Sequence, residues 1–134
     1  MHYQIRVAKS GKKHECNIVH RNGTPGKSQW SISVGEEFEL FELADEHHWT
    51  GDGRNYWSIK SNRQKPQPIG TRGEFIARFL PHREDTWHGF PGCPRERKGD
   101  RPINRVLNAW YEAQMISWSL RKKIARRQIC TLYD

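Results

Sequence analysis

Apolar and polar residues alternate along the first half of the chain in the manner of β-strands. The alternation is visible at residues 2–8, 30–34 and 56–59, and residues 16–20 contain a short apolar pair. Turn-forming residues rich in Gly, Asn and Pro separate these segments. The pattern predicts an antiparallel meander of four or five strands within residues 2–60.

The segment 36–46 breaks the alternation. Phe38 and Leu40 share one phase, whereas Phe41 and Leu43 have the opposite phase. Such a shift is typical of either a bulged strand or a short helix with an irregular apolar face. We expect a strand here, which would extend the meander.

The second half of the chain has helical periodicity at two places. Thr71 and Glu74 have the spacing of a capping box, which predicts a short helix over residues 72–80 that Pro81 ends. Apolar residues then recur every three or four positions near the C-terminus, which predicts one long helix over residues 103–129. The members of this apolar stripe are Ile103, Val106, Leu107, Trp110, Ala113, Ser117, Leu120 and Ile124.

Residues 81–102 contain four Pro and three Gly, so they predict a long loop pinned to the body by Trp87 and Phe90. The fold class that follows is α+β, formed by a single domain over residues 1–134. An antiparallel sheet of four or five strands in the N-terminal half would pack against the long C-terminal helix and the short helix.

Composition indicates a core built from large rings. Only 34% of the 134 residues are hydrophobic and the mean hydropathy is −0.97, but six Trp, five Phe and four Tyr supply apolar surface. Trp30, Tyr56 and Trp57 lie on expected strands, where an exposed row of aromatic rings would stack on unpaired bases. Because aliphatic residues are few, we expect these three rings to be packed in the core under the C-terminal helix.

The three cysteines are Cys16, Cys93 and Cys130, an odd number whose spacings match no disulfide framework. The first residues show no charged-then-apolar leader, and no window approaches the roughly 20 apolar residues of a membrane span. These features predict a soluble cytoplasmic protein with reduced thiols and no membrane partner.

Charge points to a polyanionic partner. The formal net charge is +8, with a sequence pI near 9.7. Residues 36–46 hold six of the fifteen acids and no base, so the rest of the chain has 23 bases against 9 acids. This imbalance favours a nucleic acid, DNA or RNA, as the partner.

The basic end of the C-terminal helix is the first candidate site. We predict a small nucleic-acid-binding protein that contacts the phosphate backbone there, because a row of cations releases counterions from phosphates. No base-reading motif accompanies the row. The contacting residues would be Arg121, Lys122, Lys123, Arg126 and Arg127.

The second candidate site is the histidine-rich segment 81–89. His82, Asp85 and His88 are spaced three apart, and Arg83 adds a cation. Two histidines with an arginine are the minimal set for metal-independent RNA cleavage, so a toxin-like ribonuclease is the enzymatic alternative. His82, Asp85 and His88, with Cys93 as a fourth ligand, could bind zinc, but they match no established metal-binding spacing, and we assign no metal and no cofactor.

Three further patterns have simpler interpretations. Gly26-Lys27-Ser28 lacks the upstream Gly of a phosphate-binding loop, since residue 21 is Arg, and we interpret it as a hairpin turn. The pairs His47 with His48, and His14 with Cys16, lack partners for a metal site.

A third function remains open, in which separate acidic and basic faces bind a protein partner or another copy of the chain.

Overall fold

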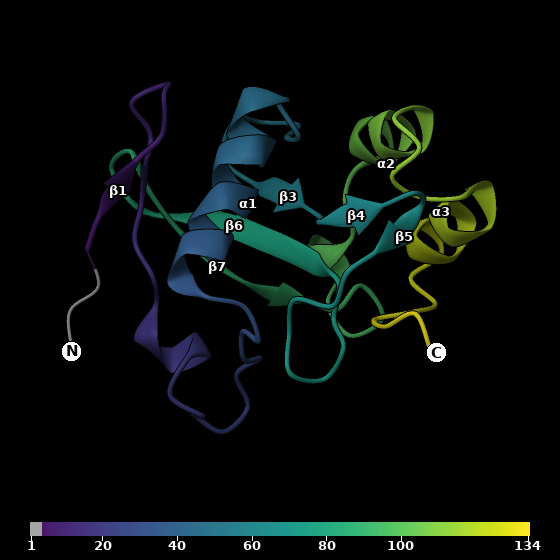
Figure 1. Ribbon diagram of the computed structural model, residues 1–134, viewed down its shortest axis with the longest axis horizontal. Helices are drawn as coiled ribbons and strands as arrows, with labels where there is room; N and C mark the ends of the chain where they lie inside the picture. Colours follow the sequence, from purple (N-terminus) through teal and green to yellow (C-terminus); the bar gives the residue numbers. More distant parts are fainter. Residues whose placement is uncertain (1–3) are drawn as a thin grey trace.

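The β6–β7 hairpin forms the centre of the molecule in the computed structural model, which describes residues 4–134 (Figure 1). The hairpin belongs to a five-stranded sheet, and the described residues also form a two-stranded sheet and three α-helices. The strands are β1 (Arg6–Val7), β2 (Lys13–His14), β3 (Tyr56–Ser58), β4 (Ser61–Asn62), β5 (Lys65–Pro66), β6 (Ile76–Arg83) and β7 (Thr86–Gly92). The helices are α1 (Val34–Glu46), α2 (Asn104–Glu112) and α3 (Trp118–Ala125), with 3-10 turns η1 (Ile18–His20) and η2 (Lys98–Asp100).

The sheet is mixed, so the prediction of an antiparallel sheet within residues 2–60 is wrong. Its strand order is β1-β2-β7-β6-β3, and β2 runs parallel to β7 while the other pairs are antiparallel. The two long strands come from the second half of the chain, and the first half contributes only short edge segments. Tyr56–Ser58 is the predicted strand that the structure confirms most fully.

Residues 76–80 of the expected short helix are instead the first part of strand β6, and ten of the 22 residues of the expected loop 81–102 belong to β6 and β7. The capping-box signal misled because the Glu74 carboxylate accepts a hydrogen bond from the Arg72 backbone N–H and closes a turn. Gly89 explains why the two strands can pair closely, since a Cβ there would lie 2.3 Å from the Phe79 ring. The Pro and Gly residues of this segment therefore predicted a loop, although the hairpin accommodates the prolines and requires the glycine.

Residues 36–46 belong to helix α1, so the expected strand is wrong. The missed signal is a capping box, in which Ser33 Oγ accepts from the Glu36 N–H and the Glu36 carboxylate accepts from the Ser33 N–H. The buried positions recur at helical spacing, and Phe41 packs against Tyr56, Phe79 and Trp87. Helix α1 thus covers one face of the sheet (Figure 1).

The predicted C-terminal helix 103–129 is two helices with a break between them. Gln114 has a φ of 60°, outside helical geometry, and Ser117 caps α3 by accepting a hydrogen bond from the Leu120 N–H. Ser117 has the spacing of the apolar stripe, and this spacing conceals its role as a helix start. The first half of the stripe is confirmed, since Val106, Leu107 and Trp110 are buried.

Aromatic rings form a large part of the core, as predicted, alongside buried Ile, Leu and Val side chains. Trp30, Tyr56 and Trp57 are all buried, and Trp110 and Phe41 are fully buried. Trp30 and Tyr56 pack against rings beneath α1, however, and not under the C-terminal helices. Within residues 4–134, the helices are too short or too polar for any of them to cross a bilayer.

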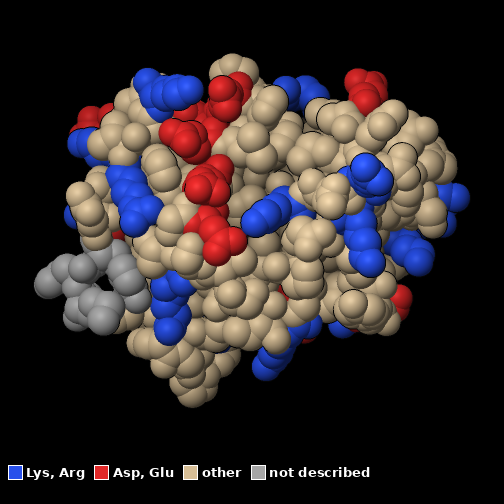
Figure 2. Space-filling model, viewed as in Figure 1, with Lys and Arg blue, Asp and Glu red and all other residues tan. Residues whose placement is uncertain are grey.

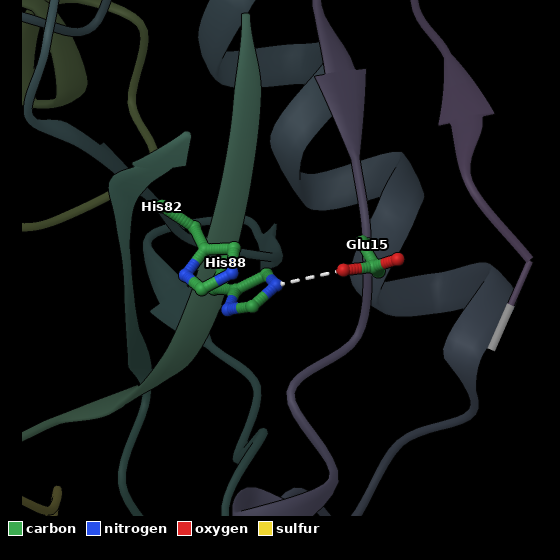
Figure 3. A group of neighbouring side chains, drawn as sticks. All are labelled: Glu15, His82 and His88. Carbon is green, nitrogen blue, oxygen red and sulfur yellow. Dashed lines mark hydrogen bonds and ion pairs between the residues drawn. The ribbon is translucent and has the colours of Figure 1, made fainter. Parts of the chain in front are cut away.

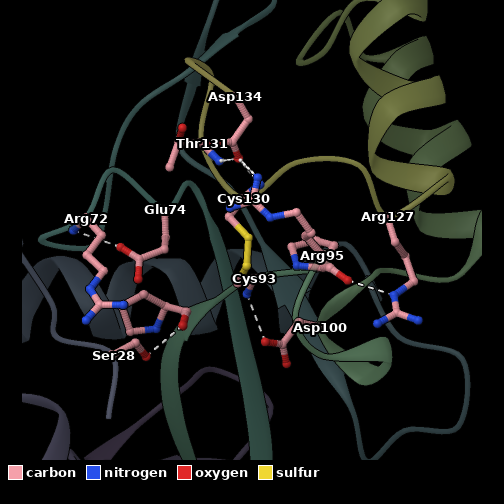
Figure 4. The surroundings of a disulfide bond; sticks show 12 residues. Ser28, Arg72, Glu74, Cys93, Arg95, Asp100, Arg127, Cys130, Thr131 and Asp134 are labelled. Carbon is pink, nitrogen blue, oxygen red and sulfur yellow. Dashed lines mark hydrogen bonds and ion pairs between the residues drawn. A yellow bond between two sulfur atoms is a disulfide. The ribbon is translucent and has the colours of Figure 1, made fainter. Parts of the chain in front are cut away.

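Cys93 and Cys130 form a disulfide bond, which contradicts the expectation that the thiols are reduced (Figure 4). Their Cα atoms lie 4.5 Å apart, although 37 positions separate them along the chain. Cys16 is buried and free. The bond joins the end of β7 to the segment that follows α3, where Arg95 also pairs with Asp134.

Candidate functional site

The five predicted cations of the C-terminal segment lie on and just after α3. Lys122, Lys123 and Arg126 are exposed, and Arg121 and Arg127 are half-buried. Within residues 4–134 none of the five forms an ion pair with a carboxylate: Arg121 donates to the Asn108 side chain and Arg127 to the carbonyl of Pro94. Their positive charges are therefore not neutralised by this part of the chain.

Two exposed aromatic rings lie beside these cations, and the sequence reasoning missed both. Trp118 is 51% exposed and Tyr111 is 40% exposed, with ring centroids 5.2 Å apart. The Arg121 guanidinium lies 5.0 Å from the Trp118 ring centre. The available signal was that Trp118 falls outside the apolar stripe, which already indicated that it does not face the core.

Helical spacing places Trp118, Lys122 and Arg126 along one line of α3. They are four residues apart, so they share one side of the helix and its C-terminal cap. A ring followed by two cations in line is an arrangement that can contact a base and successive phosphates. We call this line, together with Tyr111 and Arg121, the α3 face.

A cavity of about 790 Å³ adjoins α3, between it and the β3–β6 side of the sheet. Its charged lining consists of four cations, Arg78, Lys98, Arg101 and Arg127, and one acid, Asp52, and its apolar part includes Trp57, Ile103 and Ala125. One of the four is neutralised, because Arg78 pairs with buried Asp100 at 3.0 Å. Burial, together with the nearby charge of Arg121, lowers the pKa of Arg101.

The densest group of acidic side chains lies over α1. Figure 2 shows it as a column on that helix, whereas Lys and Arg side chains surround α3, with single acidic side chains near α2 and below α3. Three of the α1 carboxylates are paired within their own neighbourhood, Glu36 with Lys60, Glu37 with Arg21 and Asp45 with Lys12. The acidic helix therefore leaves the cations of α3 available to a partner.

The histidine-rich segment converges in part. The rings of His82 on β6 and His88 on β7 stack, with centroids 4.1 Å apart (Figure 3). Asp85 does not join them, since it lies in the turn of the hairpin with a φ of 54°. Glu15 takes its place: its carboxylate lies 3.2 Å from His88 Nε2 and 3.5 Å from the Arg83 guanidinium.

The chemistry that this histidine pair can perform is limited by its stacking. Burial lowers the pKa of His88, which favours the neutral ring. Cleavage of RNA by an acid and a base requires the two groups to flank the phosphate, because the attacking and leaving oxygens lie on opposite sides of phosphorus. Rings in contact leave no space for a phosphate between them, so the arrangement favours a shared ligand over metal-independent cleavage.

The other candidate positions have structural partners. His14 and Cys16 both contact Glu37, a fully buried carboxylate that also pairs with Arg21. Burial and Glu37 raise the pKa of the Cys16 thiol to about 12, so the thiol is protonated. Exposed His47 stacks on Trp49.

The Gly26-Lys27-Ser28 segment forms a turn, in which the Ser28 hydroxyl donates to the carbonyl of Pro91. The strand expected after it is absent apart from a single bridge at Trp30, and helix α1 begins at Val34. Ser28 thus connects this turn to the end of β7.

Cys93 forms the disulfide and therefore cannot serve as the fourth zinc ligand that the sequence suggested.

Comparisons of the chain with protein-family models, curated proteins and solved structures found no significant match. The function therefore has to be argued from the sites themselves.

Proposed function

We propose that the protein binds single-stranded nucleic acid through the α3 face. The observation that carries the proposal is the line of Trp118, Lys122 and Arg126, an exposed ring followed by two cations that no carboxylate within residues 4–134 neutralises. Such cations gain affinity for phosphates by releasing condensed counterions. The ring adds stacking on a base, which requires the base to be unpaired.

The stacking surface distinguishes single strands from duplexes. Bases inside a duplex present only their edges to a protein, whereas an unpaired base offers a face to Trp118 or Tyr111. Alanine substitution of a base-stacking ring costs ~1–3 kcal/mol in binding free energy. Sequence preference should be slight, because every base has a face that can stack.

The adjoining cavity supports the same function. Arg127 borders both α3 and the cavity, whose Lys98 side chain is exposed. A strand that follows the cations of α3 would meet this cavity at the C-terminal end of the helix. Its apolar part, with cations around it, suits one flexible nucleotide, with the base inside and the phosphate near the guanidinium groups.

Fluorescence anisotropy with a labelled oligonucleotide, single-stranded or annealed to its complement, tests the proposal. At ~50 mM salt we expect binding to the single strand, weaker binding to the duplex, and a loss of single-strand affinity of about 10-fold in Trp118→Ala. A Lys9→Ala/Lys27→Ala variant, which removes exposed cations outside α3, is the control. Equal affinity of Trp118→Ala and the control variant would contradict the proposal.

Self-association through opposite charges is the competing explanation of the same charge pattern. It would join the acidic surface of α1 in one copy to the α3 face of another. Sedimentation of the protein at rising concentration and salt separates the two functions, because salt-sensitive dimers would form without nucleic acid. A monomer that binds the oligonucleotide supports the proposed function.

A further inference from the structure

Glu15 meets His82 and His88, two residues of the β6–β7 hairpin that lie far from it along the chain. Glu15 follows β2, His82 lies on β6 and His88 on β7, and Figure 3 shows the three side chains grouped beside the sheet. His14 packs on Phe41 of α1, so Glu15, the next residue, points to the opposite face. The cluster therefore lies on the side of the sheet that α1 does not cover.

Backbone pairing holds two of the three residues in place. His88 pairs with Leu80 in the hairpin, and the Glu15 N–H donates to the carbonyl of Trp87 at 3.1 Å, which fixes Glu15 beside the same strand. His82 lies at the register shift between Pro81 and Arg83, where its ring stacks on that of His88. Sheet hydrogen bonds thus position Glu15 and His88, and the bulge and the ring stacking position His82.

The donor atoms suit a metal ion. One nitrogen from each ring and one oxygen of Glu15 lie within 4.8 Å of one another. Ligand atoms around a tetrahedral zinc ion with bonds of ~2.0–2.2 Å are ~3.3 Å apart. Glu15 and His88 already meet this spacing at 3.2 Å, and small side-chain rotations would bring His82 to it.

His82 supplies an independent observation. Its ring is exposed and stacked on His88, yet it has no hydrogen-bond partner in the part of the chain that the structure describes. His88 and Glu15, by contrast, are already hydrogen-bonded to each other. A metal ion would use a nitrogen of His82 that the protein otherwise leaves free.

We propose that Glu15, His82 and His88 bind one divalent transition-metal ion of the zinc class. Two neutral imidazoles and one carboxylate form a donor set that such ions accept, and the exposed side of His82 leaves room for water as a further ligand. Arg83, 3.5 Å from the second oxygen of Glu15, would orient the carboxylate from outside the metal shell. This inference is independent of nucleic-acid binding, which uses a different surface.

Metal titration of the full chain tests the site directly. Protein without a polyhistidine tag is treated with EDTA, desalted and titrated with Zn²⁺ by calorimetry, and with Co²⁺ by visible absorption. We expect one equivalent of bound metal, with affinity at least ~10-fold lower in His82→Ala and in Glu15→Gln. His82 is exposed, so His82→Ala should fold, which circular dichroism checks.

A His47→Ala/His48→Ala variant is the matched control, because it removes two exposed histidines at the end of α1. Full metal binding by this control, together with loss in His82→Ala, supports the site. Absence of binding to wild type at ~100 µM Zn²⁺ would overturn it. Unchanged affinity in His82→Ala, or loss of affinity in the control, would overturn it as well.

Discussion

Helices α1 and α3 differ in how the protein uses their charges. On α1, Glu36 caps the helix and pairs with Lys60, and Glu37 is buried in a network with His14, Cys16 and Arg21. On α3, the exposed cations meet no carboxylate within residues 4–134. The difference teaches that net charge alone says little about binding: charges satisfied internally stabilise the fold, and charges left open are available to a partner.

Glu37→Gln should give the largest loss of stability. The carboxylate accepts from His14 at 2.6 Å and from Arg21 at 2.8 Å, and removing its charge leaves Arg21 without its ionic partner. We expect the free energy of unfolding to fall by ~3–5 kcal/mol, measured by urea denaturation. Glu39→Gln, an exposed site on the same helix, should change it by less than ~0.5 kcal/mol. Equal stability of the two variants would show that the buried network is dispensable.

Removal of the disulfide, which lies on the side of the molecule that holds α3, should lower the free energy of unfolding by a similar or slightly smaller amount than Glu37→Gln. The bond joins residues 37 positions apart, so it reduces the conformational entropy of the unfolded chain. From loop-closure entropy, Cys93→Ser/Cys130→Ser should lower the free energy of unfolding by ~4 kcal/mol. Engineered disulfides often stabilise by less than this relation gives. Urea unfolding of this variant should not respond to dithiothreitol, whereas the wild type should become less stable in it. A wild type indifferent to reductant would contradict the bond.

Acid should lower the free energy of unfolding through His20, by less than Glu37→Gln or the removal of the disulfide does. Burial lowers the pKa of His20 below its ordinary 6.5, against the opposing effects of a hydrogen bond to the Ser28 carbonyl and of Glu37, while Lys27 and Arg97 lower it further. The unfolded chain therefore binds the proton more readily, so stability is retained above pH 6.5 and falls as the pH drops below it. Urea unfolding at several pH values should show a shallower fall in His20→Gln. An identical slope in both proteins would contradict this assignment.

Substitutions on the α3 face should have the smallest effect on stability. Lys122→Ala/Arg126→Ala removes exposed side chains that pair with no carboxylate of the described residues 4–134, so the free energy of unfolding should change by less than ~0.5 kcal/mol. Thermal unfolding at low salt checks this. A loss as large as that of Glu37→Gln would mean that these cations are structural.

The sequence predicted the composition of the core better than the topology. Periodicity identified Val106, Leu107 and Trp110 as buried, and scarcity of aliphatic residues indicated that Trp30 and Tyr56 belong to the core. The β6–β7 hairpin was missed because its prolines and glycines resemble those of a loop. Their compatibility with a strand depends on contacts such as that of Gly89 with Phe79, which only the folded chain shows.

The candidate sites show the same limit. Local spacing identified the cations of α3 and drew attention to His82 and His88. Glu15 could not be found in this way, because it reaches them through the parallel pairing of β2 with β7, which joins strands more than 70 positions apart. Asp85, nearer in sequence, is directed away by the tight turn of the hairpin.

The salt dependence of oligonucleotide binding tests the central claim most directly. Plotted against the logarithm of salt concentration, the logarithm of the association constant for a single strand falls with a slope of about −0.7 for each phosphate neutralised. We predict that Lys122→Ala/Arg126→Ala binds more weakly and has a slope shallower by ~1.4, whereas Lys9→Ala/Lys27→Ala retains the wild-type slope. The same slope in all three proteins, or no binding at ~50 mM salt, would contradict the account.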